Sequence, residues 1–141
     1  IYTLSLHDAL PILSCRGKQV LLVEDNELNL EIAVELLKYA GLNITTAKNG
    51  LEGLDKFKAA PPGTYALILM DIQMPVMNGL EAAKAIRALP VNDAQTVPIV
   101  AMTANAFPED IAATLQAGMN EHLSKPIDLE QFHSILQKWC Q

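Results

Sequence analysis

Five short apolar runs alternate with amphipathic segments from Lys18 to the end of the chain. Each run has the length of a buried strand, and the segments between the runs have the apolar spacing of helices. Chains in which strands and helices alternate in this way fold into sheets of parallel strands covered by helices. The sequence therefore predicts one α/β domain, with strands at residues 19–23, 43–47, 66–70, 99–102 and 121–123.

The apolar character of each run predicts its place in the sheet. The first, third and fourth runs are the most apolar, as expected for central strands that helices cover on both faces. The second and fifth runs contain more polar residues, so we expect them nearer the edges.

Helix boundaries are marked by capping residues, glycines and prolines. Ala33 and Leu37 share one face of a helix that begins near Asn26. Pro108 fits the first turn of a later helix, and Asp128 is a predicted N-cap for the last one. The remaining helices are predicted over 50–60, 78–89 and 108–118, and residues 90–98 are predicted to form a polar surface loop.

Composition restricts the functional classes open to the chain. Its 141 residues, half of them apolar, are enough for one domain with a substantial core. The net charge of −6 and the scattered basic residues argue against direct nucleic-acid binding. No apolar run approaches the roughly 18 to 20 residues of a membrane span. Cys15 and Cys140 have no metal or redox spacing, so we expect ordinary thiols in a reducing cytoplasm.

The first 16 residues do not fit the α/β pattern. Asp8 and Pro11 interrupt their apolar character, and the positive region that opens a secretory signal is missing. The segment is similar to translated adapter or vector sequence. We therefore expect residues 1–16 to be a non-native or disordered leader and residues 17–141 to form the domain.

Three acidic residues stand at the ends of two predicted strands. Glu24 and Asp25 follow the first strand, and Asp71 follows the third. The carboxyl ends of parallel strands lie along one edge of an open α/β sheet, where ligands bind. Three crowded carboxylates repel one another unless a cation lies between them, and a cluster of oxygen ligands suits Mg²⁺. The sequence therefore predicts a Mg²⁺ site.

The fourth and fifth strands bring two further groups to the same edge. Right-handed crossovers place Thr103 and Lys125 beside the acids. Asp71 can attack a phosphoryl group as a nucleophile and form an acyl phosphate. The hydroxyl of Thr103 and the ammonium of Lys125 can contact the phosphoryl oxygens. These residue types together predict phosphoryl transfer.

Four separate motifs resemble those of the response-regulator receiver domain. They are VEDN at 23–26, MDIQMPVMNG at 70–79, MTA at 102–104 and SKP at 124–126. The resemblance covers residues 18–141 and agrees in residue type, order and place at strand ends. It implies a flavodoxin-like (βα)5 fold, which is a doubly wound five-stranded parallel sheet of strand order 2-1-3-4-5.

The resemblance also implies metal and phosphoryl sites. Asp71 would be the phosphorylation site and would receive the group from a partner's phosphohistidine. Asp25 and Asp71 would bind Mg²⁺ directly. Glu24 would bind it through water, and the backbone carbonyl of Gln73 would complete the protein ligands.

Catalytic and switching roles follow from the same resemblance. Thr103 and Lys125 would contact the phosphoryl group and act with Asp71 in catalysis. Thr103 would also be coupled to a switch side chain on the last strand, where His122 replaces the usual Tyr or Phe. The bond between Lys125 and Pro126 is expected to be cis, a geometry that X-Pro bonds permit.

His122 and the residues around Asp25 and Thr103 are most similar to those of receivers embedded in hybrid sensor histidine kinases. The expected partners are the dimerisation and phosphoacceptor domain of a histidine kinase and a histidine phosphotransfer domain, with no direct contact to nucleic acid or membrane. The domain would be cytoplasmic, either free or as the cytoplasmic part of a membrane-bound sensor. Its own chemistry would be autophosphorylation and autodephosphorylation, and a hybrid parent would be a histidine kinase.

Two functions of other classes compete with this interpretation. A phosphatase of the haloacid-dehalogenase type also uses an Asp nucleophile, but it needs an acid two residues later, where this chain has Gln73. A receiver-shaped interaction module that is never phosphorylated would not need the acids and Lys125 together. Within the receiver class, a free-standing regulator and a transcription-factor receiver stay open.

Overall fold

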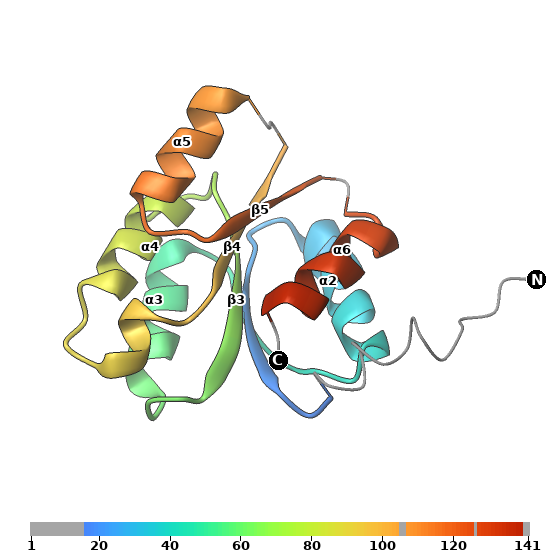
Figure 1. Ribbon diagram of the computed structural model, residues 1–141, viewed down its shortest axis with the longest axis horizontal. Coiled ribbons are helices and arrows are strands. Elements are labelled where there is room, and N and C mark those ends of the chain that lie inside the picture. Colours follow the sequence, from blue (N-terminus) through green and yellow to red (C-terminus); the bar gives the residue numbers. More distant parts are fainter. Residues whose placement is uncertain (1–15, 105–106, 126, 140–141) are drawn as a thin grey trace, which may run out of the picture.

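The computed structural model describes residues 16–104, 107–125 and 127–139. In this part of the chain, five strands form one sheet of order β2-β1-β3-β4-β5, and all neighbouring strands are parallel (Figure 1). The predicted doubly wound α/β fold and its strand order are confirmed. The strands are β1 (Gln19–Val23), β2 (Asn43–Ala47), β3 (Tyr65–Asp71), β4 (Ile99–Thr103) and β5 (Glu121–Ser124).

Helices cover both faces of the sheet. They are α2 (Glu27–Tyr39), α3 (Gly50–Ala59), α4 (Gly79–Arg87), the 3₁₀ helix η1 (Asn92–Gln95), α5 (Pro108–Gln116) and α6 (Leu129–Trp139). Helices α2 and α6 lie on one face, and α3, α4 and α5 lie on the other (Figure 1). The central strands β1, β3 and β4 are the most deeply buried, as their apolar sequences predict.

Alternation along the strands divides the core into two layers. Val20 and Leu22 of β1 pack in the layer that contains α2 and α6. Leu21 and Val23 of the same strand pack in the layer that contains α3 and α4. Because successive side chains of a strand point to opposite faces, a continuous apolar run serves both layers.

Side-chain caps fix where the helices begin. The side chains of Asn26, Asn49 and Asn78 each accept a hydrogen bond from the backbone three residues later. Asn78 also forms a capping box with Glu81, and the predicted cap Asp128 accepts a hydrogen bond from the Gln131 N–H at 2.7 Å. Since Asn26 lies only three residues beyond the end of β1, its cap holds the intervening acidic pair close to the sheet edge.

The segment 90–98 is not the exposed polar loop that its sequence suggests. It contains η1, and Ala94 within it is completely buried. The guanidinium of Arg87 donates hydrogen bonds to the backbone oxygens of Ala94 at 3.0 Å and Gly118 at 2.9 Å. It also bonds Oδ1 of Asn120 at 2.9 Å. This one side chain therefore ties the segment to the turn after α5, and helix α4 ends at Arg87 rather than at residue 89.

Some predictions lie outside the described residues. These are the leader, except for residue 16, both cysteines, and the Pro126 side of the expected cis peptide bond. Among the described helices, none has the length and hydrophobicity required to cross a membrane.

Candidate functional site

Four strands end around one pocket of about 250 Å³. Asp71 and Thr103 are the last residues of β3 and β4, while Glu24 and Lys125 directly follow β1 and β5. The pocket brings together the residues predicted for the phosphoryl and metal sites, which are Glu24, Asp25, Asp71, Gln73, Thr103 and Lys125.

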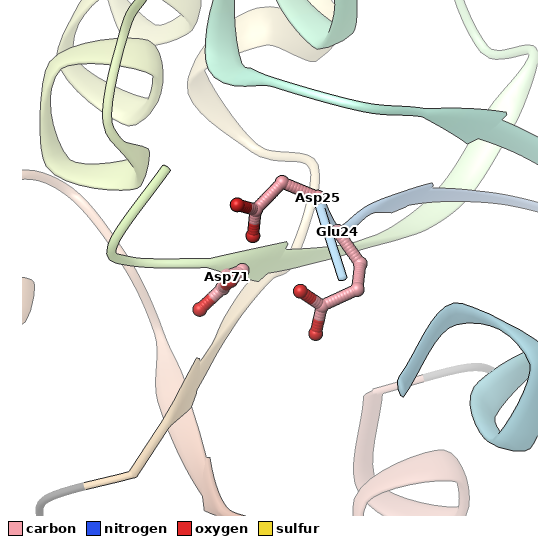
Figure 2. Close-up of side chains that lie close together, drawn as sticks. All are labelled: Glu24, Asp25 and Asp71. Carbon is pink, nitrogen blue, oxygen red and sulfur yellow. The ribbon is translucent and has the colours of Figure 1, made fainter. Parts of the chain in front are cut away.

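The three carboxylates form a compact group. Ligand atoms of Glu24, Asp25 and Asp71 all lie within 4.8 Å of one another. Figure 2 shows the three side chains gathered at the ends of neighbouring strands. Glu24 is 1% exposed and Asp71 6%, whereas Asp25 is exposed. Buried carboxylates at this spacing need a counter-charge, so the donor set fits a hard cation with oxygen ligands.

Lys125, which follows the edge strand β5, supplies a positive charge to this pocket. Its Nζ lies 2.8 Å from Oε1 of Glu24 and 3.2 Å from Oδ1 of Asp71. The side chain is 18% exposed, so this is a largely buried ionic cluster. Pairing of this kind is the usual condition for keeping charged groups inside a protein.

Burial and the second carboxylate control the titration of Asp71. Burial, followed by the hydrogen bond and charge of Glu24, raises the pKa of Asp71 from 3.8 to about 7, although Lys125 acts in the opposite direction. Burial alone would lower the pKa of Lys125, but the two carboxylates outweigh it and raise that pKa. The charge of Asp71 therefore depends on what else enters the pocket.

Close backbone packing fixes the loop that follows Asp71. The N–H of Gly79 bonds the carbonyl of Ile72 at 2.8 Å, and that of Gly50 bonds the carbonyl of Met77 at 2.9 Å. A Cβ atom at Gly79 would collide with the backbone carbonyl of Asp71, so only glycine fits at this close approach. Val76 in the same loop has a φ of 70°, a strained value for a β-branched residue. This loop is therefore held in one conformation beside the acids.

The pocket also contains residues that the motifs do not mark. Leu80 of α4, and Asp110 and Ala113 of α5, contribute to its wall. Asp110 lies in the first turn of α5, where an acidic residue also suits the helix dipole, so its sequence position has an ordinary explanation. Only the placement of α5 over the strand ends reveals its proximity to the site.

His122 lies apart from the acidic pocket. It lines a separate hollow between β5 and α6 together with Asp128 and Ser134. In the sheet its partner is Ala101, two residues before the end of β4. The geometry therefore assigns His122 no direct contact with the carboxylates, and its predicted switch role stays a prediction.

The whole pattern corresponds to one known family. The sequence matches the profile of the response regulator receiver domain over residues 20–137, which is most of the chain. This chain belongs to the response regulator receiver domain family. Its flavodoxin-like fold and its acidic pocket agree with that membership.

A histidine kinase and a sensor protein are among its relatives. The chain is 39% identical over 121 residues to the peroxide stress-activated histidine kinase mak1 of Schizosaccharomyces pombe, a match that covers 85% of this chain and 7% of mak1. It is 38% identical over 130 residues to the sensor protein GacS of Pseudomonas syringae, covering 92% of this chain and 14% of GacS. The chain thus spans only a small part of these relatives.

Solved receiver structures are also similar. The receiver domain of the sensor histidine kinase PA1611 from Pseudomonas aeruginosa, crystallised with magnesium in its active-site cleft, has a TM-score of 0.79 at 37% identity. That match covers 88% of this chain and 98% of the other. The Saccharomyces cerevisiae co-crystal of the phosphotransfer protein Ypd1 with the receiver of Ssk1 gives a TM-score of 0.78 at 34% identity, covering 89% and 90%.

Proposed function

We propose that this receiver domain accepts a phosphoryl group on Asp71 and passes it on or uses it to switch an output surface. The observation that supports this function most is the contact between the buried Asp71 carboxylate and the partly buried Lys125 ammonium group, in a pocket that two further carboxylates line. Phosphoryl transfer requires a nucleophile, a positive charge that stabilises the phosphoryl oxygens, and a pocket that admits the donor.

The same acids fit Mg²⁺. Asp25 and Asp71 would hold the ion directly, Glu24 would hold it through water, and the carbonyl of Gln73 would complete the protein ligands. When bound, the ion supplies positive charge to the oxygens of the transferring group. The magnesium in the cleft of the PA1611 receiver supports this assignment.

The chain's own residues account for the transfer. An ionised Asp71 carboxylate oxygen forms a bond to phosphorus while the bond from phosphorus to the donor atom breaks. The donor, a phosphohistidine nitrogen or the oxygen of a small acyl phosphate, leaves with the electron pair of that bond. Lys125 and Thr103 donate hydrogen bonds to the phosphoryl oxygens, and Lys125 stays protonated because neighbouring carboxylates raise its pKa. Hydrolysis by water reverses the modification.

An exposed apolar stripe on α2 supports a protein donor. Leu28 is 65% exposed, Ile32 45% and Tyr39 62%, and they lie along the outer side of the helix. Asn26, which caps this helix, lines the acidic pocket, so the stripe begins at the pocket. Exposed apolar surface of this kind indicates a protein contact. We assign it to a phosphohistidine-bearing helical domain, and the Ypd1 complex of a similar receiver supports this assignment.

The similarity to mak1 and GacS supports an origin in a hybrid histidine kinase. In that setting residues 17–141 form the receiver, residues 1–16 are a leader foreign to it, and the domain works in the cytoplasm. His122 and Thr103 would then report phosphorylation to the surface formed by α5, β5 and α6.

The proposed acceptor function can be tested with a small phosphodonor. Intact mass should increase by one phosphoryl group when the protein is incubated with acetyl phosphate and Mg²⁺, and EDTA should prevent the increase. Asp71→Asn should abolish the increase, whereas Asp55→Asn, on the exposed side of α3, is a matched control that should gain the phosphoryl group as the wild type does. Absence of any mass increase under these conditions would contradict the proposed function.

A further inference from the structure

Glu24 is the most deeply buried carboxylate of the site. Its side chain is 1% exposed, and both of its oxygens contact protein groups. Oε1 accepts a hydrogen bond from Lys125 Nζ at 2.8 Å, and Oε2 accepts one from the Asn26 N–H at 3.2 Å. The shorter of the two ionic contacts of Lys125 is therefore to Glu24 and not to Asp71, which lies at 3.2 Å.

The contact between Glu24 and Lys125 crosses most of the sheet. Strands β3 and β4 lie between β1 and β5, so the two strand ends are three strand spacings apart, roughly 14 Å. The long side chains of Glu24 and Lys125 meet across this gap at 2.8 Å. An aspartate in place of Glu24 would be shorter by one methylene, roughly 1.3 Å, and the contact would exceed hydrogen-bond distance.

The second carboxylate oxygen of Glu24 is bound by a backbone group. Oε2 of Glu24 accepts its hydrogen bond from the N–H of Asn26, the residue that caps α2. This bond restrains the carboxylate, and through it the ammonium group, relative to the start of α2. The long lysine side chain would otherwise lose several rotatable bonds of freedom each time it reached the pocket.

We propose that Glu24 is a positioning residue for Lys125, holding its ammonium group beside Asp71 before the phosphodonor arrives. This inference rests on the function proposed above and assigns Glu24 a task beyond water-mediated metal binding. The task depends on the length of the side chain, whereas a purely electrostatic contribution to cation binding depends on its charge. Pre-placed donors need no rearrangement when charge develops on the phosphoryl oxygens.

Two substitutions separate length from charge. Glu24→Gln keeps the length and can still offer an amide oxygen to Lys125, while Glu24→Asp keeps the charge but shortens the side chain. With acetyl phosphate at saturation and excess Mg²⁺, we expect Glu24→Asp to slow phosphorylation by about tenfold or more, and Glu24→Gln by about threefold. By calorimetry, Mg²⁺ affinity should fall more in Glu24→Gln than in Glu24→Asp. The reverse order of rates would overturn the proposal.

A double-mutant cycle tests whether Glu24 acts through Lys125. In a Lys125→Gln background, Glu24→Asp should slow phosphorylation by less than about twofold, because the group that Glu24 positions has been removed. If Glu24→Asp slowed phosphorylation by the same factor in both backgrounds, the proposal would be contradicted.

A spectroscopic measurement keeps the inference independent of activity. In ¹⁵N NMR spectra of the metal-free protein, the Lys125 ammonium signal should show restricted motion in the wild type and in Glu24→Gln, and greater mobility in Glu24→Asp. Unchanged mobility in Glu24→Asp would overturn the positioning role. If the wild type itself accepts no phosphoryl group while this difference in mobility is found, the acceptor function fails and the contact between Glu24 and Lys125 stands.

Discussion

The ammonium nitrogen of Lys125 lies 3.2 Å from Oδ1 of Asp71, yet this ion pair does not hold the carboxyl in its ordinary titration range. Burial and the adjacent Glu24 outweigh the lysine and raise the pKa of Asp71 to about 7. In the metal-free protein, the proposed nucleophile is therefore partly protonated near neutral pH. Further positive charge in the site would favour its ionised form.

Asp71→Asn should change how stability depends on pH. Because folding raises the pKa of Asp71 from 3.8 to about 7, its contribution to stability is present below pH 3.8 and is lost as pH rises to about 7. Asparagine does not titrate, so without Mg²⁺ the variant should gain stability relative to the wild type, by about 2 kcal/mol between pH 5 and pH 8. Urea denaturation at several pH values measures this difference. Parallel pH profiles for the two proteins would contradict the raised pKa.

Gly79→Ala should destabilise the domain and disturb the site. The added methyl group would meet the backbone carbonyl of Asp71, which cannot move without shifting the end of β3. We expect a loss of about 2 to 4 kcal/mol in the free energy of unfolding, measured by urea denaturation. Gly63→Ala is a useful comparison, because nothing lies within 4 Å of its added methyl group and only its φ of 83° opposes the change. Equal losses for both variants would show that the contact with Asp71 is unimportant.

Arg87→Lys should loosen the end of the sheet opposite the site. A lysine cannot reproduce the three hydrogen bonds that the guanidinium makes to Ala94, Gly118 and Asn120. We expect a loss of about 1 to 3 kcal/mol and faster amide exchange in residues 92–97. Lys84→Arg, on the exposed side of the same helix, is the matched control and should change stability little. Unaltered exchange in residues 92–97 would contradict the tethering role.

His122 provides a test of the predicted switch. If Thr103 and Lys125 transmit the new charge to β5, the ring resonances of His122 should shift when beryllofluoride and Mg²⁺ are added. A response confined to the loops around Asp71 would mean that the domain carries a phosphoryl group without this switch.

The sequence predicts the positions of those site residues that lie at the end of a strand. Asp71 and Lys125 could be placed together because the order and direction of parallel strands fix where those ends lie. The preference of Lys125 for Glu24 could not be predicted, since it depends on side-chain conformations that reach across two intervening strands. Asp110 was missed for a related reason, because its place in the pocket depends on how α5 packs.

Segment 90–98 illustrates a different limit. Its polar composition is typical of a surface loop, but the burial of Ala94 depends on Arg87, which bonds the backbone of this segment and of the distant Gly118. Contacts between a charged side chain and remote backbone carbonyls leave no periodic pattern in a sequence. The limits of α4 and η1 therefore required the structure.

Chemical mapping of the phosphorylated residue tests the central claim most directly. After phosphorylation by acetyl phosphate with Mg²⁺, borohydride reduction converts an aspartyl phosphate to homoserine, which tandem mass spectrometry of peptides can locate. Our account predicts homoserine at position 71, with Asp25 and Glu24 unmodified. Modification at either of those acids, or at any other residue with Asp71 intact, would contradict the assignment of Asp71 as the phosphoacceptor.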